Sequence, residues 1–173
     1  FQIFQKEGFQ NTICIPNTVK IEDYLFKERN GVLPRFLGVL SFAEIYNPML
    51  AVKVYEKVKN LYSIATLCMV GPDKDGSSNK CVQLPRKLGV EKSIHLTGGL
   101  KKSSWTNLSK ECDIFINTTN YDNMPVSVVE AMALGLPIVS TNAGGLKYLL
   151  NDGEDALLVP RNDIGMMVKK LTL

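Results

Sequence analysis

The 173-residue sequence is poor in residues that bind metal ions, with one histidine and four cysteines, none of them in a Cys-x-x-Cys pair. A structural zinc site takes four cysteine or histidine ligands at close spacings, so we expect no metal site. Each cysteine lies in or beside an apolar run, which is typical of reduced thiols in a core. These cysteines are Cys14, Cys68, Cys81 and Cys112.

Long apolar runs and a strong net charge are also missing. No run approaches the roughly 20 residues that a membrane-spanning helix needs, which argues against an integral membrane protein. The 20 Lys and Arg residues nearly balance the 17 Asp and Glu residues, and this net charge of +3 is too weak for a nucleic-acid surface. Hydrophobic residues make up 45% of the chain, which excludes disorder and suffices for one core.

Short apolar runs alternate with helical patterns from Arg35 onwards. The first run has no polar alternation, as expected for a strand that is covered on both faces of a parallel sheet. The alternation predicts an α/β fold, a doubly wound Rossmann-like parallel sheet flanked by helices. The expected strands are 35–42, 64–70, 94–97, 114–117, 138–140 and 157–159. The expected helices are 48–61 after Asn47 as N-cap, 78–88 with a kink or break at Pro85, one capped by Ser103 or Ser104, 125–134, and one from 164.

The first 34 residues fit this alternation less well. Their periodicity is mixed, and residues 20–30 are charged. We interpret residues 1–34 as a lead-in segment that packs on a domain formed by residues 35–173. Because the sequence starts without Met and stops within an expected helix, we expect it to be a piece of a longer protein.

Four loops that follow expected strands are candidate ligand sites. They are 41–47, 98–102, 118–124 and 141–145, and in open α/β sheets ligands bind at the carboxyl ends of the strands. The loop 118–124 is the richest, because Asp122 precedes a helix opened by Pro125 whose first-turn amides can attract an anion. The glycine pairs 98–99 and 144–145 lack the Gly-x-Gly-x-x-Gly spacing of a dinucleotide site and are also compatible with ordinary turns.

The helix after Pro125 is apolar except for Ser127 and Glu130, which stand three residues apart on one stripe. One interpretation is a solvated edge of a half-buried helix. The other is that Glu130 lines a cleft, where its carboxylate can accept hydrogen bonds from vicinal sugar hydroxyls. Periodicity favours the first interpretation, and both stay open.

The segment 122–139 resembles the signature of retaining glycosyltransferase family 4, also described as glycosyl transferases group 1. Asp122 and Glu130 have the seven-residue separation of that family's acidic pair, and Ala-Met-Ala, Gly and Pro follow as in the family. The segments 142–145 and 152–154 look like the motifs that come next. Residues 15–17, Ile-Pro-Asn, resemble the stretch by which such chains enter their second domain.

This resemblance implies the C-terminal, donor-binding half of a two-domain GT-B fold, without the N-terminal acceptor domain. By analogy Glu130 holds the ribose of a nucleotide sugar, and Asp122 and the amides of the next two residues face the transferred hexose. Both acidic residues are thus the expected catalytic residues. The remaining expected donor-binding residues are Ser41, Tyr46, Gly98, Gly99, Leu100, Asn123, Met124, Pro125 and Val126.

The same resemblance implies the wider setting. The reaction needs neither a metal ion nor a cofactor, and the acceptor is a glycan or a lipid-linked molecule, as in polysaccharide or lipopolysaccharide biosynthesis. We expect a cytoplasmic location, with the cytoplasmic face of a membrane as an alternative, and no nucleic acid as partner.

The resemblance has one departure, at the phosphates. The family places an Arg and a Lys after the first strand, where they neutralise the donor diphosphate, and this sequence has Ser41 and Tyr46 there. Cations at a departing diphosphate commonly supply several kcal/mol, although Lys101, Lys102 or Lys147 could replace them. The alternative is therefore a degenerate, non-catalytic nucleotide-sugar-binding module. We expect the isolated chain to be inactive in either case, and an epimerase or a nicotinamide-binding domain has little support.

Overall fold

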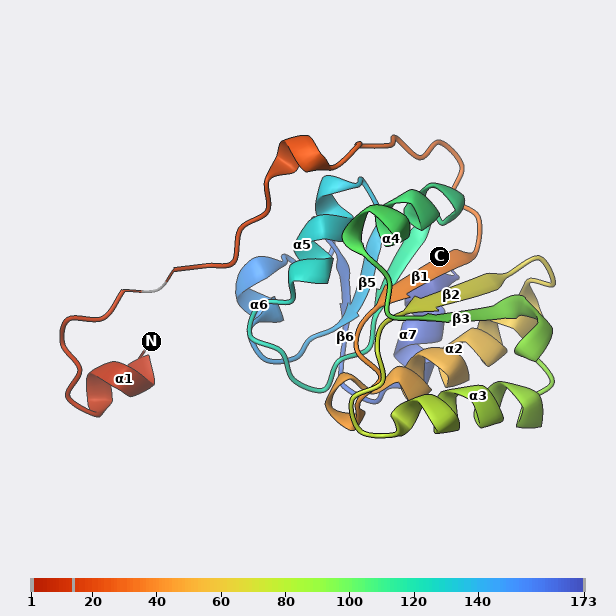
Figure 1. The fold of residues 1–173 in the computed structure, drawn as a ribbon, viewed down its shortest axis with the longest axis horizontal. Coiled ribbons are helices and arrows are strands. Elements are labelled where there is room, and N and C mark those ends of the chain that lie inside the picture. Colours follow the sequence, from red (N-terminus) through yellow and green to blue (C-terminus); the bar gives the residue numbers. More distant parts are fainter. Residues whose placement is uncertain (1, 14, 173) are drawn as a thin grey trace.

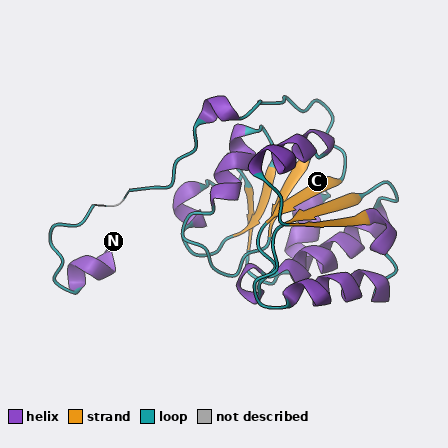
Figure 2. Ribbon diagram, viewed as in Figure 1, coloured by secondary structure: helices purple, strands orange, loops and turns teal. Residues whose placement is uncertain are grey.

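The computed structural model describes residues 2–13 and 15–172 of the chain. Within these residues, six apolar runs form one sheet in which all neighbouring strands are parallel, in the order β3-β2-β1-β4-β5-β6 (Figures 1 and 2). This order confirms the predicted doubly wound, Rossmann-like α/β fold. The strands are β1 (Arg35–Val39), β2 (Thr66–Val70), β3 (Ile94–Gly98), β4 (Ile114–Asn117), β5 (Ile138–Thr141) and β6 (Leu157–Val159).

Helices cover both faces of the sheet. The helices α2, α3 and α7 lie on one face, and α4, α5 and α6 lie on the other (Figure 1). The N-terminal helix α1 stands away from the sheet at the end of an extended segment, with Ile3 and Phe4 exposed. The helices are α1 (Gln2–Lys6), α2 (Pro48–Leu61), α3 (Ser77–Lys87), α4 (Lys102–Leu108), α5 (Val126–Ala133), α6 (Leu146–Leu149) and α7 (Ile164–Leu171). Short 3₁₀ turns are formed by Ile21–Asp23, Glu44–Tyr46, Glu91–Ser93 and Ser109–Glu111.

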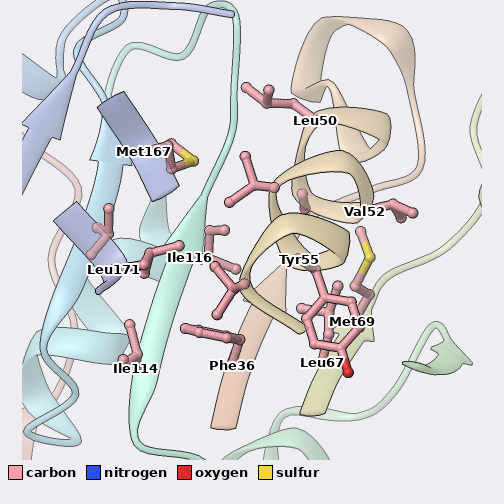
Figure 3. Close-up of a cluster of buried hydrophobic side chains, with 14 of the residues drawn as sticks. Phe36, Leu50, Val52, Tyr55, Leu67, Met69, Ile114, Ile116, Met167 and Leu171 are labelled. Carbon is pink, nitrogen blue, oxygen red and sulfur yellow. The ribbon is translucent and has the colours of Figure 1, made fainter. Parts of the chain in front are cut away.

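Successive strand residues point to opposite faces, so each face builds its own core. Phe36 of β1 packs edge-to-face against Tyr55 of α2, with ring centroids 6.4 Å apart. Figure 3 shows these two side chains with Ile116 and Met167 in the cluster between the sheet, α2 and α7. Leu37, the next residue of β1, belongs to the second cluster, under α4, α5 and α6. Each fully buried side chain of this size stabilises the fold by about 1.5 to 3 kcal/mol.

Several predicted boundaries are confirmed and some are wrong. The strands 114–117 and 157–159 and the start of α7 agree with prediction. The first strand ends at Val39 rather than at residue 42, because Phe42 leaves the sheet while staying buried and its N–H donates to Pro72 O at 2.8 Å. Helix α3 runs through Pro85 without a break.

Of the two predicted helix caps, Asn47 is confirmed as the N-cap residue of α2, which begins at Pro48, and the serine cap of α4 is wrong. No side chain caps α4, which starts at Lys102, so that Ser103 and Ser104 lie inside its first turn. Asn47 precedes α2 with a left-handed φ of 48° and makes no side-chain cap hydrogen bond. Its amide instead donates to Asn162 Oδ1 at 2.7 Å, which joins two loops at one edge of the sheet.

The thiols Cys68, Cys81 and Cys112 are free, as predicted, and Cys14 lies outside the described residues. Burial raises the pKa of Cys81 to about 11 and that of Cys112 to about 12, which makes both thiols unreactive at neutral pH. Among residues 2–13 and 15–172, no group of acidic, His or Cys side chains is arranged to hold a metal ion. In the same residues, no helix has the length and apolar character to cross a membrane.

Candidate functional site

The site is built between β1 and β4, where the order of the strands in the sheet reverses while their direction stays parallel. In open α/β sheets, ligands bind at such a point, beyond the carboxyl ends of the two strands. The two loops are residues 40–47 and 118–125. They are joined by Asn120 N–H donating to Ile45 O at 2.8 Å and by the Thr118 hydroxyl donating to Asn47 O at 3.0 Å. The structure therefore fixes both predicted loops against each other.

Two glycines hold the loop with Asp122 in place. Gly145 N–H donates to Asp122 O at 2.7 Å, and Gly144 has a positive φ of 59°. A Cβ atom at Gly145 would lie 1.6 Å from Asn123 O, and one at Gly144 would lie 2.1 Å from Asp122 O. Because the two backbones touch, only glycine fits at these positions. This pair is thus a packing requirement of the candidate site rather than ordinary turn punctuation.

Asp122 itself is half-buried at the carboxyl edge of the sheet. Its Oδ1 accepts a hydrogen bond from Met124 N–H at 3.2 Å. Burial raises the pKa of this carboxyl, and the hydrogen bonds from the Met124 and Asn123 amides oppose the rise. The group is thus a partly desolvated carboxylate beside the start of α5.

The residues from Asn123 to the start of α5 at Val126 differ in exposure. Asn123 and Val126 are exposed, Met124 is half-buried and Pro125 is buried. Asn17 of the lead-in segment donates to Met124 O at 2.8 Å. The Ile-Pro-Asn segment of the lead-in therefore reaches the loop that carries Asp122.

Glu130 lies in the second turn of α5 and is only 5% exposed. Its Oε1 accepts hydrogen bonds from the Tyr24 hydroxyl at 2.7 Å and from Lys102 Nζ at 2.8 Å. The Glu130 carboxylate raises the pKa of Lys102, and burial raises the pKa of Tyr24. The solvated-edge interpretation of Glu130 is therefore wrong, because the carboxylate is a buried and partnered group.

The loop after β3 leads directly to Lys102, which contacts Glu130. Gly98 has a positive φ of 70°, and its carbonyl accepts from Gly71 N–H at 2.9 Å. Gly99 and Leu100 are exposed at the carboxyl end of the sheet, two residues before α4 begins at Lys102. The chain thus places the predicted base-binding loop next to the lysine that contacts Glu130.

The loop after β1 carries no cation. Ser41 and Tyr46 are both half-buried, and the residues between them are apolar or acidic. The loop is fastened to the one that follows β2, where Asp75 Oδ2 accepts from Glu44 N–H at 2.8 Å. Hydrogen bonds, from the Ser77 side chain foremost, lower the pKa of Asp75, so this carboxylate is ionised at neutral pH.

The other candidate lysines are engaged or placed elsewhere. Lys102 forms the ion pair with Glu130, and Lys147 of α6 lies 5.0 Å from the ring centroid of Tyr148. Sequence reasoning missed Tyr24 altogether, because Tyr24 and Glu130 are 106 positions apart and no periodicity links them.

Comparison with known proteins gives a consistent picture. The model of the family "Glycosyl transferases group 1" matches residues 26–173. An uncharacterized glycosyltransferase of Haemophilus influenzae is 29% identical over 163 residues, which is 94% of this chain and 44% of that protein. A galactosyltransferase of Escherichia coli, named for UDP-Gal and alpha-D-GlcNAc-diphosphoundecaprenol, is 31% identical over 84 residues, 49% of this chain and 21% of its own length.

Solved structures share the fold. Staphylococcus aureus TarM, in a complex that includes UDP, superposes with a TM-score of 0.86 at 18% identity over 98% of this chain and 34% of its own. Anabaena HepE, in complex with UDP-glucose, has a TM-score of 0.73 at 16% identity over 99% of this chain and 41% of its own. The chain thus spans less than half the length of each of these proteins.

Proposed function

The chain belongs to the glycosyl transferases group 1 family, and from this we propose that it is the donor-binding domain of a retaining glycosyltransferase. The whole protein would move a hexosyl group from a nucleotide-diphosphate sugar to a glycan or a lipid-linked acceptor. The observation that carries the proposal is the arrangement of the loop after β4 and of helix α5, which follows it. It holds the half-buried Asp122 and the buried Glu130 on one continuous segment of the chain.

Each part of this arrangement has a chemical task in the proposal. Glu130 accepts hydrogen bonds from the ribose hydroxyls, which a buried carboxylate does more strongly than an exposed one. Asp122 and the exposed amide end of α5 face the hexose. Glycosyl transfer breaks the bond between the anomeric carbon and the diphosphate oxygen and forms one to the acceptor hydroxyl. In the proposal neither a metal ion nor a cofactor takes part.

The solved relatives support a nucleotide sugar as the ligand, since one was determined with UDP and the other with UDP-glucose. We place the acceptor on a separate domain, because the chain spans 44% of the Haemophilus relative. The chain alone would then bind donor without transferring it. The proposed setting is polysaccharide or lipopolysaccharide synthesis in the cytoplasm, or at the cytoplasmic face of a membrane when the acceptor is a lipid.

The loop 40–47 favours a second candidate, a nucleotide-sugar-binding module that does not catalyse. A diphosphate that leaves carries growing negative charge, and the loop itself has no guanidinium or ammonium group, while its Glu44 N–H is bonded to the Asp75 carboxylate. Such a module would keep the ribose and hexose contacts and lose turnover.

Calorimetry of the 173-residue chain tests the shared part of both candidates. We expect binding of UDP, GDP or ADP without magnesium, at affinities in the micromolar to millimolar range that ordinary nucleotide contacts provide. Undetectable binding of all three at millimolar concentration, or binding only with a divalent cation, contradicts the donor site. Turnover by the full-length protein with a panel of donor sugars then separates enzyme from module.

A further inference from the structure

The lead-in segment runs along the whole length of α5. Asn17 bonds Met124 O just before the helix, Tyr24 bonds Glu130 in its middle, and Arg29 donates to Leu134 O at 2.9 Å at its end. The Arg29 guanidinium donates to five backbone carbonyls in total, those of Lys27, Ser109, Cys112, Leu134 and Gly135. Tyr24 is therefore held between two anchors and is itself buried, with 7% exposure.

Tyr24 and Lys102 approach Glu130 from two different elements. Both donate to the same oxygen, Oε1, and Lys102 Nζ also lies 5.6 Å from the centroid of the Tyr24 ring. The three side chains thus form a closed triangle. In the described part of the chain no buried side-chain polar atom lacks a partner, so the other oxygen, Oε2, to which neither donor is bonded, keeps a small exposed surface.

This arrangement separates the two oxygens of one carboxylate into a fixed one and an open one. A free glutamate side chain loses rotational entropy when a ligand immobilises it, and two donors on Oε1 remove that freedom before the ligand arrives. The lysine also neutralises the carboxylate charge locally, which lessens its repulsion of a phosphorylated ligand.

We propose that Tyr24 and Lys102 are positioning residues, which hold Glu130 through Oε1 so that Oε2 meets the ribose 2′-hydroxyl of the donor nucleotide. This inference rests on the proposed donor site and adds a specificity device to it. Discrimination between ribonucleotides and deoxyribonucleotides would then depend on a residue of the lead-in segment, outside the Asp122–Glu130 motif.

The test compares UDP with 2′-deoxy-UDP by calorimetry on the 173-residue chain. The wild type should prefer UDP, and Tyr24→Phe and Lys102→Met should each reduce the ratio of the two affinities by about three- to tenfold, the net effect of one ordinary hydrogen bond. Lys102→Arg keeps a donor near Oε1 and should restore most of the preference. In a Glu130→Gln background, Tyr24→Phe should change the ratio no further.

Two matched variants control for general loss of stability. Lys57→Met breaks an ion pair with Glu56 on the other face of the molecule, and the Lys57 side chain is 60% exposed against 59% for Lys102. Tyr55→Phe removes a buried hydroxyl that donates to Ala65 O at 2.7 Å. Both controls should leave the UDP to 2′-deoxy-UDP ratio unchanged.

The outcomes separate this inference from the proposed function. Equal weakening of both nucleotides by Tyr24→Phe and Lys102→Met, or a wild type that binds both equally, overturns the positioning role and leaves the donor site standing. A wild type that binds neither nucleotide refutes the donor site itself.

Discussion

The loop after β1 and the loop after β4 lie side by side at the carboxyl end of the sheet, and they are built differently. The β4 loop carries Asp122, is pressed against a glycine pair, and continues into α5 with a buried Glu130. The β1 loop carries Ser41 and Tyr46 and is fastened to Asp75. Hydrogen bonds hold both loops in place, but only the β4 loop and α5 carry buried or half-buried carboxylates suited to a ligand.

For the proposed donor site, this difference indicates which half of a nucleotide sugar the two loops suit. Hydroxyl groups of ribose and hexose need acceptors in fixed positions, and the β4 side provides carboxylates. A diphosphate needs cations or free amide donors, and the β1 side provides neither in its side chains. The asymmetry is the physical basis for weighing the active enzyme against the non-catalytic module.

The largest expected effect comes from adding a side chain at Gly145, where the glycine backbone touches the β4 loop. In Gly145→Ala the new methyl group would lie 1.6 Å from Asn123 O, so the backbone must move. We expect a loss of about 3 kcal/mol or more of unfolding free energy, measured by urea denaturation, together with loss of nucleotide binding.

Gly165→Ala is the matched control for this prediction. Gly165 lies in α7, where a Cβ atom would be 3.6 Å from Asp163 Oδ1, an ordinary contact. This variant should be as stable as the wild type or slightly more so, since alanine is the better helix former. Equal stability of both variants would mean that the β4 loop moves to accommodate the methyl group. The close contact at Gly145 would then not be required for the fold or for the site.

The sequence predicts the fold better than it predicts these contacts. The parallel sheet follows from apolar runs without alternation, and the Asp122–Glu130 unit follows from one continuous motif. The end of β1 was missed because Phe42 is apolar and 3% exposed but lies in a loop, so hydropathy cannot separate it from the strand. The burial of Glu130 was missed because its partner Tyr24 comes from the lead-in segment, and only tertiary structure brings the two together.

The next effect in size tests Glu130 on the β4 side. Glu130→Gln keeps the shape of the side chain and one acceptor oxygen, replaces the other oxygen by an NH2 donor, and removes the charge that strengthens a hydrogen bond to ribose. We expect nucleotide affinity to fall by about 1 to 3 kcal/mol in calorimetry. Unfolding free energy should change by less than about 1 kcal/mol, because the amide oxygen can still accept from Tyr24. Unchanged affinity would return Glu130 to a purely structural role.

A smaller effect is expected from rebuilding the β1 side. The double change Ser41→Arg and Tyr46→Lys adds two cations to the loop that lacks them. If these positions face the diphosphate, UDP should bind about fivefold more tightly while uridine binds as before, and added salt should erode the gain. Calorimetry with UDP, UMP and uridine measures it. An equal gain for all three ligands, or none, would show that another cation serves the phosphates or that the loop faces elsewhere.

The smallest expected effect concerns the free-energy cost of burying the Asp122 carboxylate. Burial raises the pKa of Asp122, so the ionised carboxylate is less favourable in the folded chain than in the unfolded chain. This cost is present at neutral pH, is relieved as the pH falls through the raised folded-state pKa, and is absent below the unfolded value of about 3.9. Asp122→Asn keeps an oxygen for the bond from Met124 N–H and removes the charge.

At pH 7 we therefore expect Asp122→Asn to be more stable than the wild type by up to about 0.5 kcal/mol, because partial exposure screens the cost. The difference should shrink towards zero as the pH is lowered to about 4. Binding of a nucleotide sugar should weaken, while binding of the nucleotide alone should not change. Asp23→Asn, which alters an exposed carboxylate 4.0 Å from Lys20 Nζ, should show neither effect.

A variant that gains stability and loses sugar affinity identifies Asp122 as a residue kept for function at the expense of stability. A loss of stability that does not depend on pH would instead mean that Asp122 serves to stabilise the β4 loop. The β1 and β4 loops would then be alike, since both would be held by structural hydrogen bonds alone.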